Sequence, residues 1–392
     1  MKTKKLLKTN LKNSFTLLFS ILLFSCNQES KVPLDSFTVT GSIKGLDTEY
    51  MSRSVYKDGK RTTDSIFVKN GQFSYTAKIN KEEHIIFWPN VERTIKRSGR
   101  GYYPVKSSQF AFLAKPGDNI VFKGEVLDFI NAYPTGSKAN DDLTKINRTI
   151  FPLMNASVNF QLKKNKLQKE DPRIQLISDS IIQINNKIIS LKKEYILSNP
   201  NSEAAIWYLS DMMMRRQLSN EEAITAFNGM DNNLSNNAHY KEVETRVKGI
   251  ESTMVGKIVP DFTTNSTLDG SKFTFSSLRG KYVLIDFWGI WCGPCVAEMP
   301  KVKEYATKYA DKLTVLGIDS GDSKEKIKEF INKNKYDWQQ ILSIRNTSDD
   351  LVLKFNVAGF PTKFIIDPDG KIIQRYLGSS EKAFVKLDEL LN

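Results

Sequence analysis

The amino-acid sequence predicts a multidomain chain that ends in an α/β domain, with a small β-rich domain and a helical region before it. Three observations lead to this prediction. Short alternating apolar segments dominate residues 37–135, and long runs with helical spacing dominate residues 136–253. Residues 254–392 alternate strand and helix patterns and close with a hairpin and a helix. That order is expected of a parallel sheet with an antiparallel edge.

Composition narrows the possible functions. The chain has 392 residues, 40% hydrophobic and 26% charged, which are values typical of globular domains. Five of its 13 net positive charges are the lysines of residues 1–25, and the remaining +8 is spread over residues 26–392, so we expect a mildly basic surface and no nucleic-acid partner. Three cysteines and two histidines are too few for a structural disulfide framework, and a closed zinc site would need nearly all of them. No glycine-rich dinucleotide fingerprint follows a strand, so we expect no cofactor.

The first 25 residues have the pattern of an export signal. Five lysines precede the apolar run Phe15–Phe24, which is shorter than the roughly 20 residues that a membrane-spanning helix needs. Leu23–Cys26 resembles a bacterial lipobox, which implies cleavage before Cys26 and a lipid on its sulfur. We therefore expect a lipoprotein on the periplasmic side or the surface of a Gram-negative type envelope, with residues 26–36 as a tether. An ordinary signal peptide with a chance cysteine and an uncleaved anchor are the alternatives.

The β-rich part contains two strong turn signals. Asn70-Gly71 lies between two segments of strand character, which is typical of a tight hairpin. Lys115–Asp118 reads Lys-Pro-Gly-Asp and predicts a second turn. Residues 37–135 are therefore expected to form a small antiparallel sandwich or meander.

Residues 136–253 are expected to contain four or five helices. Asn199–Ser202 should break the helical pattern, with Ser202 as a candidate cap of the next helix. The methionine triplet Met212–Met214 is expected to pack against other apolar side chains rather than to bind copper.

The C-terminal part offers a regular series of elements. Its apolar runs and helical spacings predict strands at 282–288, 314–319, 362–366 and 371–376, and helices at 296–308, 323–334, 349–355 and 381–391.

A pair of cysteines follows the first of these strands directly. Cys292-Gly293-Pro294-Cys295 falls where a helix should begin, and the free N–H groups and dipole of a helix N-terminus stabilise a thiolate. Proline is tolerated in a first helical turn. We expect Cys292 to attack a substrate disulfide and Cys295 to resolve the mixed disulfide.

The strand and the cysteine motif, YVLIDFWGIWCGPC, resemble the active site of the thioredoxins. This resemblance covers residues 254–392 and implies a thioredoxin-like fold. It also implies that Asp286 is a buried acid that exchanges protons with the resolving thiol, and that Phe360-Pro361 forms the cis-proline loop beside the disulfide. Trp291, Gly293, Pro294 and Phe360 would then support the substrate groove.

Further residues resemble the TlpA- and ResA-like branch, which includes redoxin and AhpC/TSA-type domains. These are the opening Gly256–Phe262 and Glu298, which lies three residues after Cys295. The β-rich part resembles the domain that precedes such domains in lipoproteins of the Bacteroidetes. The chain carries both Asp286 and Glu298, so the sequence leaves open which acid moves the proton.

The resemblance implies an exported, membrane-anchored protein-disulfide reductase. Its substrates would be disulfide-bearing exported proteins, and a membrane thiol carrier would supply electrons. A disulfide oxidase or isomerase is the first alternative, because local electrostatics shift reduction potentials. A thiol peroxidase is the second, although Gly289 stands where peroxidase loops have threonine. A non-enzymatic binding lipoprotein that acts through residues 37–250 is the third.

Overall fold

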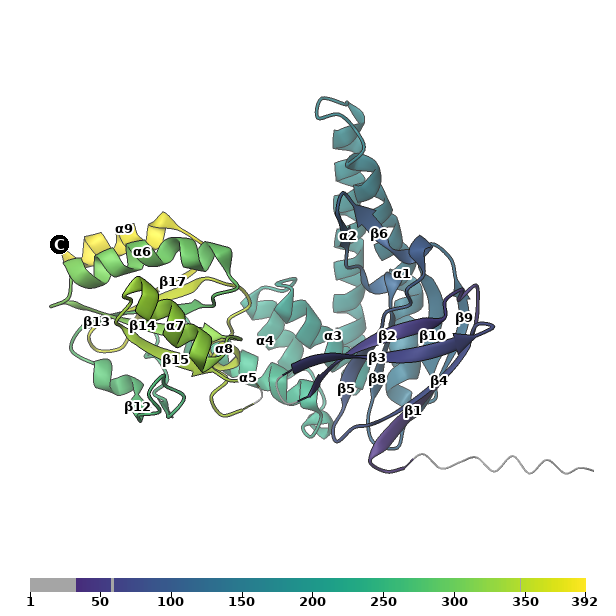
Figure 1. The fold of residues 1–392 in the computed structure, drawn as a ribbon, viewed down its shortest axis with the longest axis horizontal. Helices are drawn as coiled ribbons and strands as arrows, with labels where there is room; N and C mark the ends of the chain where they lie inside the picture. The colour runs from purple at the N-terminus through teal and green to yellow at the C-terminus, as the bar shows by residue number, and fades with distance from the viewer. Residues whose placement is uncertain (1–32, 58–59, 346) are drawn as a thin grey trace, which may run out of the picture.

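The computed structural model describes residues 33–57, 60–345 and 347–392, and it confirms the three predicted parts in their predicted order (Figure 1). The β-rich part lies at one end of the molecule and the C-terminal α/β domain at the other, with helices between them (Figure 1). The expected signal peptide and Cys26 fall outside the described residues.

The β-rich part is built on one six-stranded sheet with the order β10-β9-β1-β4-β3-β2. A second, two-stranded sheet of β5 and β8 packs against it through a core of aromatic rings, among them Phe37, Phe87 and Phe112. The strands are β1 (Ser36–Lys44), β2 (Tyr50–Lys57), β3 (Lys60–Lys69), β4 (Gln72–Lys78), β5 (Glu83–Phe87), β6 (Lys96–Ser98), β7 (Gly101–Tyr103), β8 (Phe110–Ala114), β9 (Asn119–Val126) and β10 (Ile130–Thr135).

The predicted hairpin at Asn70-Gly71 is confirmed. It joins β3 to β4, and both turn residues have positive φ, 51° at Asn70 and 73° at Gly71. A β-carbon on Gly71 would lie 2.3 Å from the carbonyl oxygen of Ile43, so this position requires glycine.

The expectation of a purely antiparallel arrangement is wrong for one strand pair. β1 runs parallel to β9 and antiparallel to β4, which makes the sheet mixed. The predicted turn at Lys115–Asp118 exists, but it leads from β8 in the small sheet to β9 in the large one. Such a change of sheet lets strands distant in sequence pair in parallel, and no local pattern signals it.

Five helices follow, in agreement with the prediction of four or five. α1 and α2 form a long hairpin that projects from the body of the molecule (Figure 1). The predicted break holds, because α2 ends at Ser198 and α3 begins at Glu203. Ser202 occupies the N-cap position, but its hydroxyl donates to Asp142 and makes no cap bond. The helices are α1 (Lys138–Lys164), α2 (Arg173–Ser198), α3 (Glu203–Met214), α4 (Asn220–Asn228) and α5 (Ala238–Ser252).

Two features fix α1 and α3 in place. The side chain of Asn140 on α1 pairs with both the N–H and the carbonyl of Leu113 on β8, at 3.0 and 2.7 Å. Met212 and Met213 are buried in the helical core, as predicted, while Met214 is partly exposed. The helical region is therefore joined to the β-rich part through specific backbone contacts.

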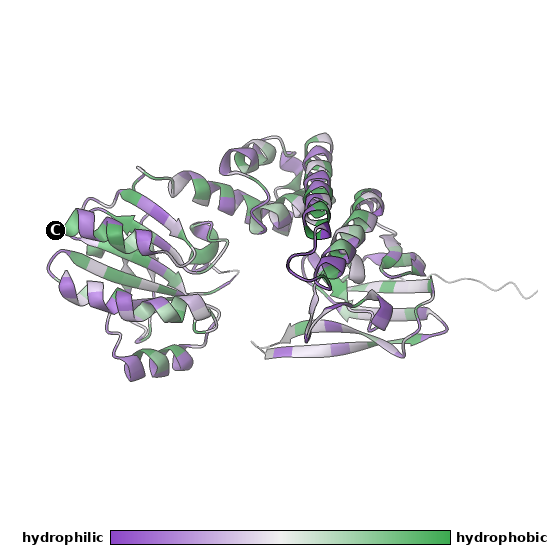
Figure 2. Cartoon of the chain, turned by 90° about the horizontal axis from the view of Figure 1, so that it is seen from above, coloured by the Kyte–Doolittle hydropathy of each residue, from purple (hydrophilic) through white to green (hydrophobic). Residues whose placement is uncertain are grey.

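The C-terminal domain has a five-stranded sheet with the order β15-β14-β13-β16-β17. β13, β14 and β15 are parallel, whereas β16 and β17 run antiparallel to their neighbours, as predicted. Figure 2 shows that apolar residues concentrate on these strands between the helices. The elements are β11 (Thr263–Thr264), β12 (Phe273–Thr274), β13 (Tyr282–Trp288), α6 (Gly293–Lys308), β14 (Leu313–Ser320), α7 (Lys324–Asn334), β15 (Gln339–Ser343), α8 (Leu351–Lys354), β16 (Thr362–Ile366), β17 (Ile372–Leu377) and α9 (Glu381–Leu391).

The helices cover the sheet in a way that positions the cysteine motif. α6 and α9 pack on one face through Tyr305, Phe384 and Leu387. α8 and residues 259–278 cover the other face. α7 packs beside the start of α6 through Ile327 and Met299, so the first turn of α6 is held from two sides.

The helical region meets the C-terminal domain where α5 contacts α8. A β-carbon on Gly249 of α5 would lie 2.4 Å from the carbonyl oxygen of Lys354, so glycine permits this close approach. Among the described residues, no helix combines the length and the apolar character needed to cross a lipid bilayer.

Candidate active site

The two cysteines lie at the point where β13 passes into α6. Cys292 is the N-cap residue of α6, and the backbone N–H of Cys295 points at its sulfur at 3.3 Å. Pro294 occupies the first turn, where no backbone donor is required. The two sulfurs form a disulfide, and Cys292 is 5% and Cys295 1% exposed. The more accessible sulfur therefore sits at the helix N-terminus, which stabilises a thiolate.

An exposed tryptophan stands beside this disulfide. Trp291 is 58% exposed, its indole N–H donates to the carbonyl of Ser320 at 2.8 Å, and its ring lies 5.2 Å from that of Phe360. The peptide bond between Phe360 and Pro361 is cis, as the resemblance implied. The carbonyl of Pro361 accepts a hydrogen bond from Gly378 at 2.8 Å, which ties this loop to the end of β17.

Three charged side chains from three elements meet behind the disulfide. Asp286 on β13 lies directly opposite Lys363 on β16, and the Lys363 ammonium is 3.2 Å from the Asp286 carboxylate. The same ammonium is 2.6 Å from the carboxylate of Glu298 on α6. Glu298 lies three residues after Cys295, so the two side chains share one face of α6. The structure thus brings Asp286 and Glu298 together, as two acids that the sequence had already indicated. Lys363, which joins them, was not among the residues predicted from the sequence.

The two acids have opposite electrostatic character. Burial raises the pKa of Asp286 above its ordinary value, and Lys363 offsets this only in part. Burial also acts on Glu298, but hydrogen bonds from Lys363 and Ser379 and from the N–H of Ser380 outweigh it and lower the pKa of this carboxyl. Glu298 is therefore held as an anion, while Asp286 is the acid that more readily takes up a proton.

Lys363 is itself 2% exposed. Burial opposes its charge, but the two adjacent carboxylates prevail and raise the pKa of this ammonium. The sequence signal was present, because a lysine two residues after Pro361 interrupts the otherwise apolar strand Thr362–Ile366. A buried strand tolerates a lysine only where it is paired, so such an interruption indicates an acidic partner.

A second pair of acids supports the loop before the cysteines. Asp322 accepts a hydrogen bond from the backbone N–H of Ile290 at 2.7 Å. Asp319, at the end of β14, accepts from the N–H of Asp322, and burial together with the Asp322 charge raises its pKa to about 8. Asp322 thus holds the backbone at Ile290, and Asp319 in turn supports Asp322. The sequence analysis missed both residues.

Replacement of Asp286 by asparagine is expected to raise the free energy of unfolding at neutral pH, because the amide removes a carboxylate that burial disfavours. A carboxyl whose pKa is higher when folded destabilises the fold increasingly as pH rises from its unfolded to its folded pKa. The advantage of D286N should therefore be absent near pH 3 and grow toward pH 7, as measured by urea unfolding at several pH values. An equal difference at all pH values would contradict this prediction.

Comparison with known proteins gives two family matches. Residues 255–375 match the AhpC/TSA family, and residues 37–143 match a domain of unknown function, DUF4369. Residues 136–253 lie largely between these matches.

Characterised relatives match the same C-terminal part. The thiol-disulfide oxidoreductase ResA of Bacillus cereus is 32% identical over 133 residues, which are 34% of this chain and 75% of ResA. The thioredoxin-like protein YneN of Bacillus subtilis is 31% identical over 146 residues, covering 36% of this chain and 81% of YneN. Among solved structures, the thioredoxin domain of a thiol-disulfide oxidoreductase from Bacteroides vulgatus is 27% identical and covers 36% of this chain and 99% of that domain, with a TM-score of 0.33.

Proposed function

Because the chain belongs, through its C-terminal domain, to the thiol-disulfide oxidoreductases of the ResA type, we propose that it works as a reductase of disulfides in other exported proteins. The family fixes the type of chemistry, which is exchange between dithiols and disulfides. We propose the direction of electron transfer, the partner proteins and the roles of single residues.

The residues around the two cysteines support the role of a disulfide reductase. The side chains clustered around Cys292 and Cys295 are apolar, among them Trp288, Met299 and Ile327. A strongly oxidising pair requires a stabilised thiolate in its reduced form. Here the Cys292 sulfur accepts one backbone N–H at the helix N-terminus, and the buried lysine of this domain, Lys363 on β16, is paired with Asp286 and Glu298. The reduced form therefore has little extra stabilisation, which favours a low potential and a reducing role.

The proposed reaction begins with the reduced protein. The Cys292 thiolate attacks one sulfur of a substrate disulfide, the substrate S–S bond breaks, and one substrate thiolate leaves and is protonated. The Cys295 thiol then loses its proton to Asp286 and attacks the sulfur of Cys292. The mixed disulfide breaks and the second substrate thiolate leaves, so two electrons have passed to the substrate. A membrane thiol carrier restores the Cys292–Cys295 dithiol.

Asp286 rather than Glu298 is assigned the proton-accepting role. Its pKa is raised by burial, which brings it toward that of a thiol and makes transfer between the two groups easier. Glu298 accepts hydrogen bonds from Lys363, Ser379 and Ser380, and these stabilise its ionised form. We propose that Glu298 fixes Lys363, which in turn positions Asp286.

The proposed place of action follows from the N-terminal pattern. A lipid on Cys26 would anchor the protein to an envelope membrane, and residues 26–36 would link the anchor to β1. Mass spectrometry of the protein isolated from the membrane fraction tests this directly. A diacylated N-terminal Cys26 is expected, and an unmodified cysteine would contradict the anchor.

The midpoint potential of the Cys292–Cys295 pair tests the direction. It is measured by redox titration of a Cys26→Ser variant, in which these two are the remaining cysteines. A value near that of thioredoxin, about −270 mV, is expected for a reductase. A value between about −120 and −180 mV would contradict the proposal and favour an oxidase or isomerase.

A further inference from the structure

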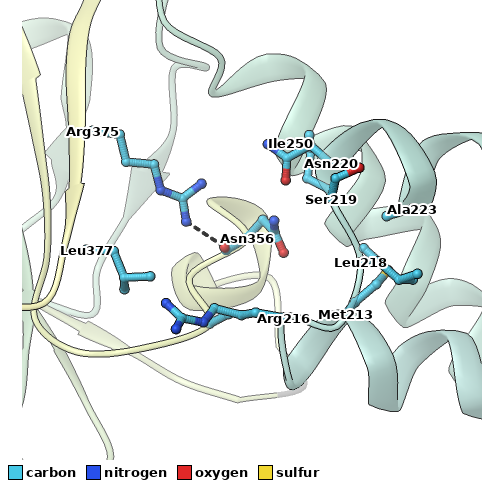
Figure 3. A pocket seen from close by; sticks show the side chains of 11 residues that line it. Met213, Arg216, Leu218, Ser219, Asn220, Ala223, Ile250, Asn356, Arg375 and Leu377 are labelled. Atoms are coloured by element: carbon cyan, nitrogen blue, oxygen red, sulfur yellow. Dashed lines mark hydrogen bonds between the residues drawn. The ribbon is translucent and has the colours of Figure 1, made fainter. Parts of the chain in front are cut away.

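A cavity lies at the junction of the helical region and the C-terminal domain. Its volume is about 330 Å³. The α3–α4 turn with the start of α4 forms one wall, and β17 with the loop before Pro361 forms the other (Figure 3). Apolar side chains make up part of the lining, among them Met213, Leu218 and Leu377. The cavity is therefore shared between two parts of the chain that have separate cores.

Two arginines enter this cavity from opposite walls. Arg375 comes from β17 and Arg216 from the α3–α4 turn, and both guanidinium groups reach toward the space beside Asn356 (Figure 3). One N–H of Arg375 donates to the carbonyl of Asn356 at 2.8 Å, which fixes its direction. Arg216 is exposed and has a left-handed backbone conformation, with φ of 54°.

The charge of these arginines has no counterpart in the cavity. None of the 11 lining residues is acidic. Burial lowers the pKa of Arg375, and its guanidinium lies 5.1 Å from the centre of the Phe364 ring, so an aromatic face rather than a carboxylate lies beside this charge. Guanidinium groups are strong donors to carboxylates, and a half-buried one without an anion leaves its remaining N–H groups available to a ligand. The lining of the cavity thus favours the binding of an anionic group.

The position of the cavity connects it to the disulfide-exchange site. Its lining includes Asn356 and Ala358, which lead into Phe360-Pro361. Leu377 lies against Gly359, since a β-carbon on that glycine would be 3.2 Å from the Leu377 methyl group. Phe360 in turn contacts Trp291 next to Cys292. The cavity and the disulfide therefore lie on opposite sides of the loop that contains Phe360-Pro361.

We propose that this cavity binds a carboxylate side chain of the protein substrate, a few residues along the chain from the disulfide that Cys292 attacks. The inference rests on the proposed function and adds a substrate preference to it. An extended chain advances about 3.3 Å per residue, so the number of residues between the half-cystine and the acidic side chain decides whether that side chain enters the cavity. The net charge of +8 that remains without the five lysines of residues 1–25 adds a general attraction for acidic partners.

The test compares disulfide-containing peptides that differ only in glutamate or glutamine at one position, scanned along both sides of the half-cystine. With the reduced full chain, we expect the best glutamate peptide to have kcat/KM about fivefold above its glutamine twin, as for one partly exposed ion pair. Arg216→Gln should remove this preference, so that the glutamate peptide and its glutamine twin have equal kcat/KM. The matched control is Arg100→Gln, which removes an exposed arginine from the β6–β7 turn and should retain the preference.

Two results with the peptides would overturn the proposal, and a third could come from phosphate. One is equal rates for glutamate and glutamine peptides at every position. The other is a glutamate preference that survives R216Q. Inorganic phosphate serves as a further probe and should weaken the glutamate preference by competing for the cavity. If phosphate binds without any effect on this preference, the cavity is a site for free anions, and the proposed substrate site is contradicted.

A failure of the proposed reductase function can be distinguished from a failure of the cavity proposal. If neither peptide is reduced, binding is measured without chemistry, by calorimetry on Cys292→Ser with the same peptides. Tighter binding of the glutamate peptide that R216Q abolishes would support the cavity site even where reduction fails. Equal binding of both peptides would refute the site whatever the direction of the redox chemistry.

Discussion

Replacing Cys292 with serine is expected to lower the rate of disulfide exchange by roughly a thousandfold or more, because the attacking sulfur is lost and a hydroxyl is not nucleophilic at neutral pH. The measurement is reduction of a disulfide peptide by the reduced protein under excess thiol donor. Cys26→Ser removes the third cysteine and should leave the rate unchanged. Equal losses in both variants would contradict the assignment of Cys292.

The partner variant gives a different result that separates the two cysteines. Cys295→Ser retains the attacking sulfur but cannot resolve the mixed disulfide, so a covalent complex with the substrate should accumulate. Non-reducing electrophoresis detects it, and added thiol should release it. A complex trapped instead on Cys295 of the C292S variant would reverse the two roles.

Replacing Lys363 with methionine is expected to destabilise the C-terminal domain by about 3 kcal/mol, because the buried Asp286 and the half-buried Glu298 would lose their shared partner. Methionine keeps the length of the side chain, so the loss reports on charge. Urea unfolding measures it, with Lys382→Met on the exposed face of α9 as the matched control. A loss in K363M no larger than in K382M would show that the cluster is not a stabilising pair.

The pH dependence of this variant has a definite sign. Without Lys363, the folded-state pKa of Asp286 and of Glu298 should rise, because the ammonium lowers both. Carboxyls with raised folded-state pKa values destabilise the fold as pH increases above their unfolded values near 4. The deficit of K363M should therefore be larger at pH 8 than at pH 5. Adding Asp286→Asn to K363M should recover part of the loss, since one of the two unpaired carboxylates is then removed.

Local features of the structure could be predicted from the sequence where one residue type satisfies one backbone requirement. Asn70-Gly71 fits a turn with two positive φ angles, the Asn199–Ser202 segment ends a helix, and the cysteine motif opens one. Each of these depends on neighbours within a few residues, which a single sequence displays directly.

The features that escaped prediction depend on contacts between distant segments. Lys363 meets Asp286 only because β16 pairs with β13 in one particular register. The parallel pairing of β1 with β9 and the cavity between Arg216 and Arg375 arise in the same way, from segments far apart in sequence. Periodicity reports which face of an element is buried, but it does not report which element covers that face.

The order of the three parts along the molecule bears on where the protein can work. The described chain begins at β1, at the end opposite the C-terminal domain (Figure 1). With the proposed lipid anchor at Cys26, the β-rich and helical parts would lie between the bilayer and Cys292. A membrane-bound electron donor would then need a domain that reaches past them, whereas soluble substrate proteins could meet Cys292 without approaching the lipid.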